Sequence, residues 1–69
     1  MRKVDSYHYY QIVFADGWSL IKTIPKELEF DDRTSLEYIL SDLDSVYNVV
    51  RVYLLYGPKN SFRKLIAEY

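Results

Sequence analysis

The chain has no cysteine, one histidine and only two glycines among its 69 residues. Without cysteine it forms neither a disulfide nor a thiolate metal site, and a lone histidine supplies no ligand set for structural zinc. Two glycines provide no phosphate-binding glycine loop, and no Gly-x-Ser-x-Gly motif is present. His8 is the only histidine available for acid–base catalysis, and no catalytic partner for it can be named. We therefore expect a protein that is not an enzyme and that has no metal or other cofactor.

Long hydrophobic runs are also absent. No segment approaches the ~20 apolar residues that a membrane-spanning helix needs. The first six residues are polar and lack the apolar core of a signal peptide. We expect a soluble, cytoplasmic protein that forms one small domain over residues 1–69. A domain of this size buries only about 60% of its unfolded surface, so binding to a second copy or to a partner is the remaining means of reinforcement.

Charge is unevenly distributed, although the formal net charge is only −1. Residues 27–44 hold seven acidic residues and one basic residue, whereas the rest of the chain holds three acidic and eight basic residues. The simplest interpretation is two solvated surfaces of opposite sign. The acidic segment is also an alternative contact surface for a basic partner, centred on Glu37, Asp42 and Asp44.

The longest run of β-branched and aromatic residues, 47–56, predicts a strand that ends before Gly57. Read with period two, one side of this strand is a core face that includes Val50, Val52 and Leu54. The other side is tyrosine and aliphatic with a single arginine, and it carries Tyr47, Val49, Arg51, Tyr53 and Leu55.

Two further strands, 7–14 and 18–24, flank an Asp-Gly pair and predict a hairpin. A two-residue loop would send the large apolar residues of the two strands to opposite faces. A three-residue loop pairs Phe14 with Trp18 and places those residues together. We therefore predict the three-residue loop, with Gly17 in the left-handed conformation of a G1 bulge.

Two amphipathic helices are predicted. Asp31 and Asp32 precede the first helix, and residues 34–37 fit a capping box. Asp31 and Asp32 could also be considered for cation binding, but capping is the simpler role for adjacent acids at a helix start. The final segment, 58–69, repeats the pattern behind a proline that suits a first turn. The apolar stripes are Leu36, Ile39, Leu40 and Leu43 in the first helix and Phe62, Leu65, Ile66 and Tyr69 in the second.

These elements predict an α+β fold of order β-β-α-β-α. The right-handed crossover rule and the preference for antiparallel pairing favour a three-stranded antiparallel sheet of order 2-1-3. Both helices are then expected on one face of the sheet. The predicted core of that face is Tyr10, Ile12, Phe14, Trp18, Leu20, Val50, Val52 and Leu54.

The opposite sheet face is the main candidate for function. It is low in charge and rich in tyrosine, and tyrosine and arginine are enriched where protein interfaces derive their binding energy. We expect a non-catalytic protein-binding module, such as a small inhibitor or adaptor of the kind that phages and plasmids carry, or a homodimer. The predicted contact residues are Tyr7, Tyr9, Ile21, Tyr47, Val49, Arg51, Tyr53 and Leu55.

Two alternatives remain for this face. Tyrosine rings with Arg51 among them could stack single-stranded nucleic acid bases. Against this, the chain is not basic overall, and the glycine–aromatic signature of the common RNA-binding sheet is absent. The other alternative is that the tyrosines only shield the sheet from water and bind nothing.

Overall fold

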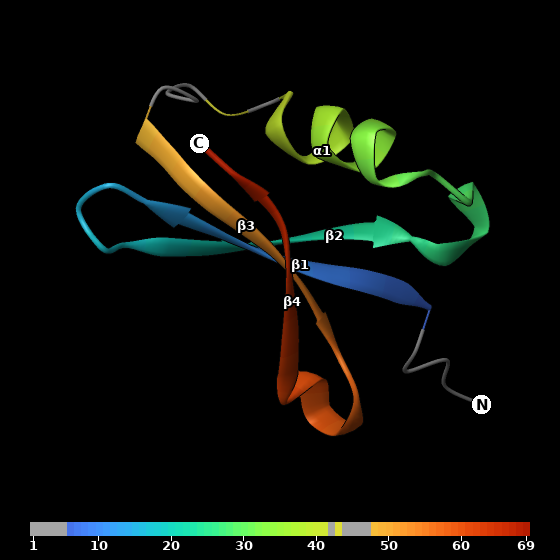
Figure 1. Cartoon of the computed structure of the whole chain (residues 1–69). Helices are drawn as coiled ribbons and strands as arrows, with labels where there is room; N and C mark the ends of the chain where they lie inside the picture. Colours follow the sequence, from blue (N-terminus) through green and yellow to red (C-terminus); the bar gives the residue numbers. More distant parts are fainter. Residues whose placement is uncertain (1–5, 42, 44–47) are drawn as a thin grey trace.

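The computed structural model of the chain describes residues 6–41, 43 and 48–69, and it shows an antiparallel sheet with one α-helix against it (Figure 1). The sheet has four strands in the order β2-β1-β3-β4. The small α+β class and the adjacency of the first three strands, 2-1-3, are therefore confirmed. In chain order the elements are β1 (Tyr7–Phe14), β2 (Ser19–Pro25), the 3₁₀ helix η1 (Lys26–Leu28), α1 (Asp32–Leu40), β3 (Val49–Tyr56), the 3₁₀ helix η3 (Pro58–Asn60) and β4 (Phe62–Glu68).

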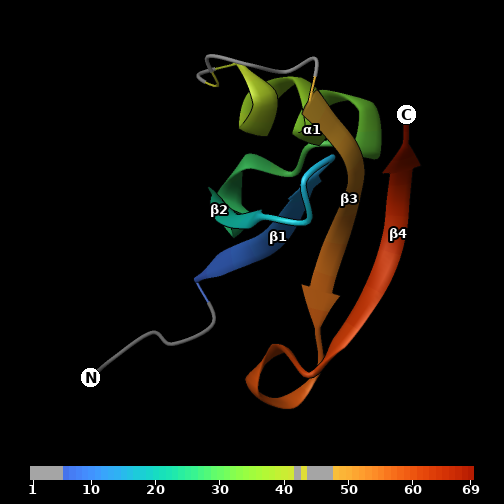
Figure 2. The same ribbon diagram turned by 90° about the vertical axis from the view of Figure 1, so that its left-hand side faces the viewer.

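The predicted second helix is wrong, because residues 62–68 form strand β4 (Figure 2). The spacing that suggested a helix does not distinguish the two structures. Phe62 and Ile66 are four residues apart, which places them on one side of a strand as well as on one side of a helix. As a strand, this segment hydrogen-bonds along the edge of β3, whose backbone groups would otherwise lack sheet partners on that side. Long-range pairing thus outweighs the local pattern.

The hairpin between β1 and β2 has the predicted three-residue loop. The N–H of Phe14 donates to the carbonyl oxygen of Trp18 at 2.8 Å, and the N–H of Gly17 donates to that of Phe14 at 2.9 Å. Gly17 has a φ of 90°, the left-handed conformation that the loop requires. The rings of Phe14 and Trp18 are 5.7 Å apart, centroid to centroid. Trp18 is nevertheless 63% exposed, so its predicted place in the core is wrong: the hairpin tip projects beyond α1 (Figure 1).

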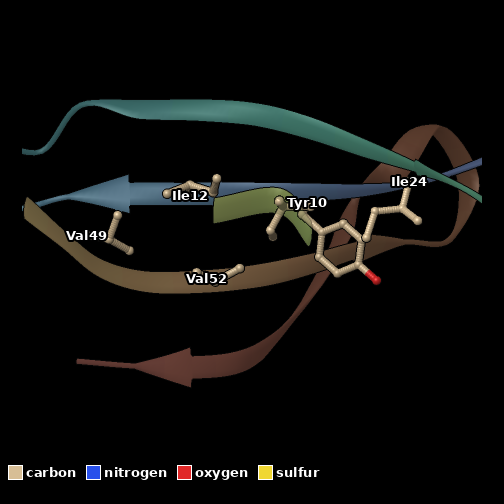
Figure 3. Packing of buried hydrophobic residues seen from close by; sticks show 6 residues of the cluster. Tyr10, Ile12, Ile24, Val49 and Val52 are labelled. Carbon is tan, nitrogen blue, oxygen red and sulfur yellow. The ribbon is translucent and has the colours of Figure 1, made fainter. Parts of the chain in front are cut away.

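The core lies between α1 and the sheet. Figure 3 shows Tyr10 and Ile12 of β1 beside Val49 and Val52 of β3. The complete set of buried hydrophobic residues among those described is Tyr10, Ile12, Ile24, Ile39, Val49 and Val52. Tyr10, Ile12 and Val52 were predicted for this core.

Val49 reaches the core because of a bulge in β3. Phe14 pairs with Val49 while Val13 pairs with Arg51, so Val50 is an extra residue in β3. This shift of one residue turns Val49 to the helix side of the sheet, where it is only 4% exposed. The prediction that Val49 faces away from the helices is therefore wrong, and Val50 does not take the buried position predicted for it.

Helix α1 begins at Asp32 and is capped by Asp31. The Oδ1 atom of Asp31 accepts a hydrogen bond from the N–H of Thr34 at 2.8 Å. The cap lies three residues before Thr34, so the predicted capping box does not form. The predicted apolar stripe is confirmed for the residues within α1, because Ile39 is fully buried and Leu36 and Leu40 pack against the core. Leu43 also packs against the core, but it lies beyond the end of α1.

Candidate functional site

One face of the sheet is turned away from α1 (Figure 1). Strand pairing defines this face, because directly paired residues point to the same side of an antiparallel sheet. Gln11, for example, pairs with Ile21 on β2 and with Tyr53 on β3. We call this surface the open face, and its residues are Tyr7, Tyr9, Gln11, Val13, Ser19, Ile21, Thr23, Arg51, Tyr53, Leu55, Arg63, Leu65 and Glu68.

Most of the predicted contact residues lie together on the open face. These are Tyr7, Tyr9, Ile21, Arg51, Tyr53 and Leu55. Val49 does not, because it is in the core. Tyr47 lies outside the described residues.

Strand β4 adds three open-face residues that the sequence reasoning missed. Arg63 pairs with Leu55, Leu65 pairs with Tyr53, and Glu68 pairs with Arg51. They were missed because the segment was interpreted as a helix. The only available signal was the tight Gly-Pro turn directly before the segment, because Arg63 and Lys64 are followed by three apolar residues and show no period-two alternation.

A connected group of polar side chains crosses the open face. The guanidinium carbon of Arg63 lies 4.2 Å from the centre of the Tyr53 ring, within the range of a cation–π contact. Arg63 Nη1 donates to Gln11 Oε1 at 3.2 Å, and Gln11 Nε2 lies 3.5 Å from Ser19 Oγ. These contacts join Arg63 of β4 to Tyr53 of β3 and to Gln11 of β1. Gln11 in turn contacts Ser19 of β2. Arg63 and Tyr53 are thereby held in one arrangement on the surface.

The second arginine of the open face, Arg51, is paired with an acid. Its Nε lies 3.3 Å from Glu68 Oε2, and the two side chains are 47% and 58% exposed. An exposed pair of this kind adds little stability. It does cancel the charge of Arg51 locally, which leaves Arg63 as the excess charge of the open face.

Large apolar side chains surround this centre. Tyr7 on β1 is 45% exposed, Ile21 on β2 is 50% exposed and Leu65 on β4 is 45% exposed. They come from three different strands, so the apolar area is spread across the face instead of being confined to one edge. Exposed apolar side chains that gather on one face of a molecule are typical of interaction sites.

The alternative acidic surface is only partly described. Glu37 is on α1 with its side chain 71% exposed, and its Oε2 lies 3.8 Å from Nε of Arg33. This is an i, i+4 helix pair on the surface, which contributes at most a few tenths of a kcal/mol, on the order of 0.3–0.5. Asp42 and Asp44 lie outside the described residues.

A second apolar surface lies between α1 and the C-terminal end of the chain. A groove of about 670 Å³ is lined by the apolar side chains of Leu36, Leu40, Val49 and Tyr69. Arg33, Glu37 and Ser41 also line it. The groove is open because β4 occupies the sheet edge and leaves no second helix to pack beside α1 within the described chain.

His8 is exposed on β1 and pairs with Ile24 on the α1 side of the sheet. Across residues 6–41, 43 and 48–69, no group of three or more His, Asp or Glu side chains is placed to hold a metal ion. In the same residues, no helix has the length and apolar character needed to cross a membrane.

Comparison with known proteins gives no match. No protein-family model, curated protein or solved structure is similar to this chain at a significant level. Any argument about function therefore depends on the surfaces described above.

Proposed function

We propose that this chain is a non-catalytic protein-binding module and that the open face is its contact surface. The observation that carries the proposal is the set of half-exposed apolar residues, Tyr7, Ile21 and Leu65, around the ordered pair of Tyr53 and Arg63. The occupant is a protein partner or a second copy of the chain. Action as a small inhibitor or adaptor requires nothing beyond such a face.

The residue types of the open face and the fixed position of the Arg63 side chain both support protein binding. Tyrosine and arginine are the residue types that most often dominate binding energy in protein interfaces. Arg63 is already held by Tyr53 and Gln11 before any partner arrives. Binding then immobilises fewer free rotamers, which lowers the entropic cost of association. A sheet face spread over four strands also suits a protein surface better than a small molecule.

A second candidate function, binding of single-stranded nucleic acid, is favoured by the stacking of Arg63 on Tyr53. The pairing of Arg51 with Glu68 weighs against it, because it removes charge that a phosphate backbone would need. The two functions differ in salt dependence. If the purified chain binds single-stranded oligonucleotides through the open face, affinity should fall steeply as salt is raised.

The test uses substitutions that place charge on the open face without touching the core. Ile21→Lys and Leu65→Lys are compared with Tyr38→Lys, a change on α1 at a side chain that is also 45% exposed. Tagged chains are used to recover partners from the source cell, and sedimentation reports self-association. We expect both open-face variants to lose the partner or the dimer, while Tyr38→Lys retains it.

Substitution by alanine measures how much single side chains contribute to the free energy of the same association. Tyr53→Ala and Arg51→Ala are expected to weaken association, with a loss of about 1 kcal/mol or more for at least one of them. Circular dichroism checks that the variants remain folded. A monomer whose partner binding is unaffected by all of these changes would exclude the open face, and the surface around Glu37 would be tested next.

A further inference from the structure

A second concave site lies at the end of the sheet where β1 begins and β3 ends. Its volume is about 680 Å³, within the range of small-molecule sites. It is formed by the first residues of β1, by Lys26 of η1 and by the turn that follows β3. Its lining includes the side chains of Tyr7, His8, Lys26, Tyr56, Lys59 and Asn60.

The charge of this site has one sign. Among the described residues, its lining includes the ammonium groups of Lys26 and Lys59 and the imidazole of His8, and no carboxylate. The ion pairs found among the described residues involve Arg33 and Arg51, and neither Lys26 nor Lys59 takes part in them. A concave surface with basic groups alone concentrates anions.

The site also offers aromatic rings. Tyr7 is 45% exposed and Tyr56 is 50% exposed, so each presents part of a ring to solvent. Tyr56 is supported from one side by Phe62, with ring centroids 5.6 Å apart. A ring held in place in this way is a platform on which a flat heterocycle can stack.

The turn that carries Lys59 has a defined and strained backbone. Lys59 and Asn60 both have a φ of 55°, in the left-handed region that side chains disfavour. Hydrogen bonds fix the turn: Asn60 N–H donates to Gly57 O at 3.0 Å, and Ser61 Oγ donates to Pro58 O at 2.7 Å. Such strain persists only where its surroundings enforce it, and it is concentrated at ligand sites. The turn therefore sets the position of the Lys59 backbone in advance of binding.

From this combination we propose that the site binds a nucleoside phosphate. The base stacks on the exposed ring of Tyr56 or Tyr7, and the phosphate is held between Lys26 and Lys59. The ligand chemistry has two sources, a free nucleotide or the phosphorylated end of a single strand. The proposal goes beyond protein binding through the open face. Tyr7 belongs to both surfaces, but Lys26 and Lys59 lie outside the open face, so their substitution tests this site alone.

The test is fluorescence anisotropy with a 5′-phosphorylated oligothymidylate of about five nucleotides, labelled at its 3′ end. The same strand with a 5′-hydroxyl is the ligand control. We expect the phosphorylated strand to bind about tenfold tighter, because charge-assisted hydrogen bonds to phosphate are the strong ones. Lys26→Glu and Lys59→Glu should each weaken its binding about tenfold. The matched variant is Lys64→Glu, the same charge change on β4 outside the site, and it should weaken binding less than about threefold.

Competition identifies the source of the ligand. Displacement of the strand by thymidine monophosphate indicates a free nucleotide, and binding of the strand without displacement indicates a strand end; either result supports the proposal. In the unmodified protein, the amide resonances of Gly57 and Lys59 should shift on addition of the phosphorylated strand, while that of Ile39 should not. The proposal is overturned by equal binding of the two strands, by an equal loss for Lys64→Glu, or by no binding at millimolar protein.

Discussion

At the scale of single residues, Asp31 determines where the helix begins. Its carboxylate accepts a hydrogen bond from the N–H of Thr34, and this bond is the main reason that the pKa of Asp31 lies below its ordinary value. The hydrogen bond favours the charged carboxylate over the neutral acid. Since the acid is exposed, the effect is a local one on the first turn of α1.

This cap predicts a pH dependence of stability. Because the folded-state pKa is lowered, the contribution of Asp31 is fully present above the unfolded pKa of about 3.9 and is lost as the pH falls through the folded pKa. Urea titrations from about pH 5 to pH 2.5 should show the free energy of unfolding decreasing. Asp31→Asn keeps an oxygen for the Thr34 N–H without titrating, so its decrease should be smaller. Identical pH profiles for the two proteins would contradict this role.

Two neighbouring residues on α1 differ in burial, because one lies in the core and the other lines the groove beside it. Ile39 is 1% exposed in the core, whereas Leu40 is only partly buried and lines the open groove. Ile39→Ala should cost about 2–5 kcal/mol, because it removes fully buried methyl groups and leaves a cavity. Leu40→Ala should cost less. Denaturant titration of both variants checks the order, and a larger loss for Leu40→Ala would show that the groove is filled in solution.

At the scale of elements, the first three strands and the helix could be predicted because each carries a local signal. Gly17 determines the hairpin, and Ile39 repeats with its neighbours at helical spacing. Strand β4 could not be predicted, because the spacing of Phe62 and Ile66 fits both a strand and a helix. What decides between them is the free edge of β3, which only the folded chain provides.

The β4 edge of the sheet is protected against pairing with other chains. Strand β4 has a bulge, since Val52 pairs with Ala67 while Tyr53 pairs with Leu65, and it carries Arg63 and Lys64. Bulges and basic side chains are common devices that prevent the addition of further strands. A partner is therefore expected to meet a face of the sheet and not the β4 edge.

The contact of Arg63 with Tyr53 joins β4 to β3, and its strength can be measured. A double-mutant cycle with Tyr53→Leu and Arg63→Met removes the ring and the charge while retaining apolar bulk. We expect a coupling energy of about 0.5–1 kcal/mol from denaturant titrations, the range of an exposed cation–π contact. Additive effects of the two changes would show that the side chains do not interact in solution.

At the scale of the whole molecule, the candidate surface was predictable only where it depends on local sequence signals. Tyr7 and Tyr9 share a face because alternation along one strand is a local property, and the pairing of β1 with β3 places Tyr53 on the same face. Val49 was misplaced because one extra residue in β3 reverses the side to which it points. Arg63 could not be placed beside Tyr53, because their proximity requires β4 to be a strand.

The arrangement of the elements also separates the charges of the molecule. Among the described residues, Glu29, Asp31 and Asp32 lie just before and at the start of α1, whereas Lys59, Arg63 and Lys64 belong to η3 and the first part of β4. Helix α1 and η3 lie at opposite ends of the molecule (Figure 2). The described part of the chain is therefore polarised even though the net charge of the sequence is close to zero. Such a field orients an approaching charged partner and makes the rate of association depend on salt.

Strand β4 hydrogen-bonds to β3 alone, whereas β1 lies between β2 and β3. Loss of β4 from the sheet would break one ladder, but release of β1 would break two and expose the core. We therefore expect the chain to open in stages, with β4 detaching before global unfolding. Backbone deuterium uptake should then be faster in residues 62–68 than in residues 7–14, and equal rates would indicate that the sheet opens as a single unit. The detached state would leave the Tyr53 ring without Arg63 and the outer edge of β3 without a neighbour.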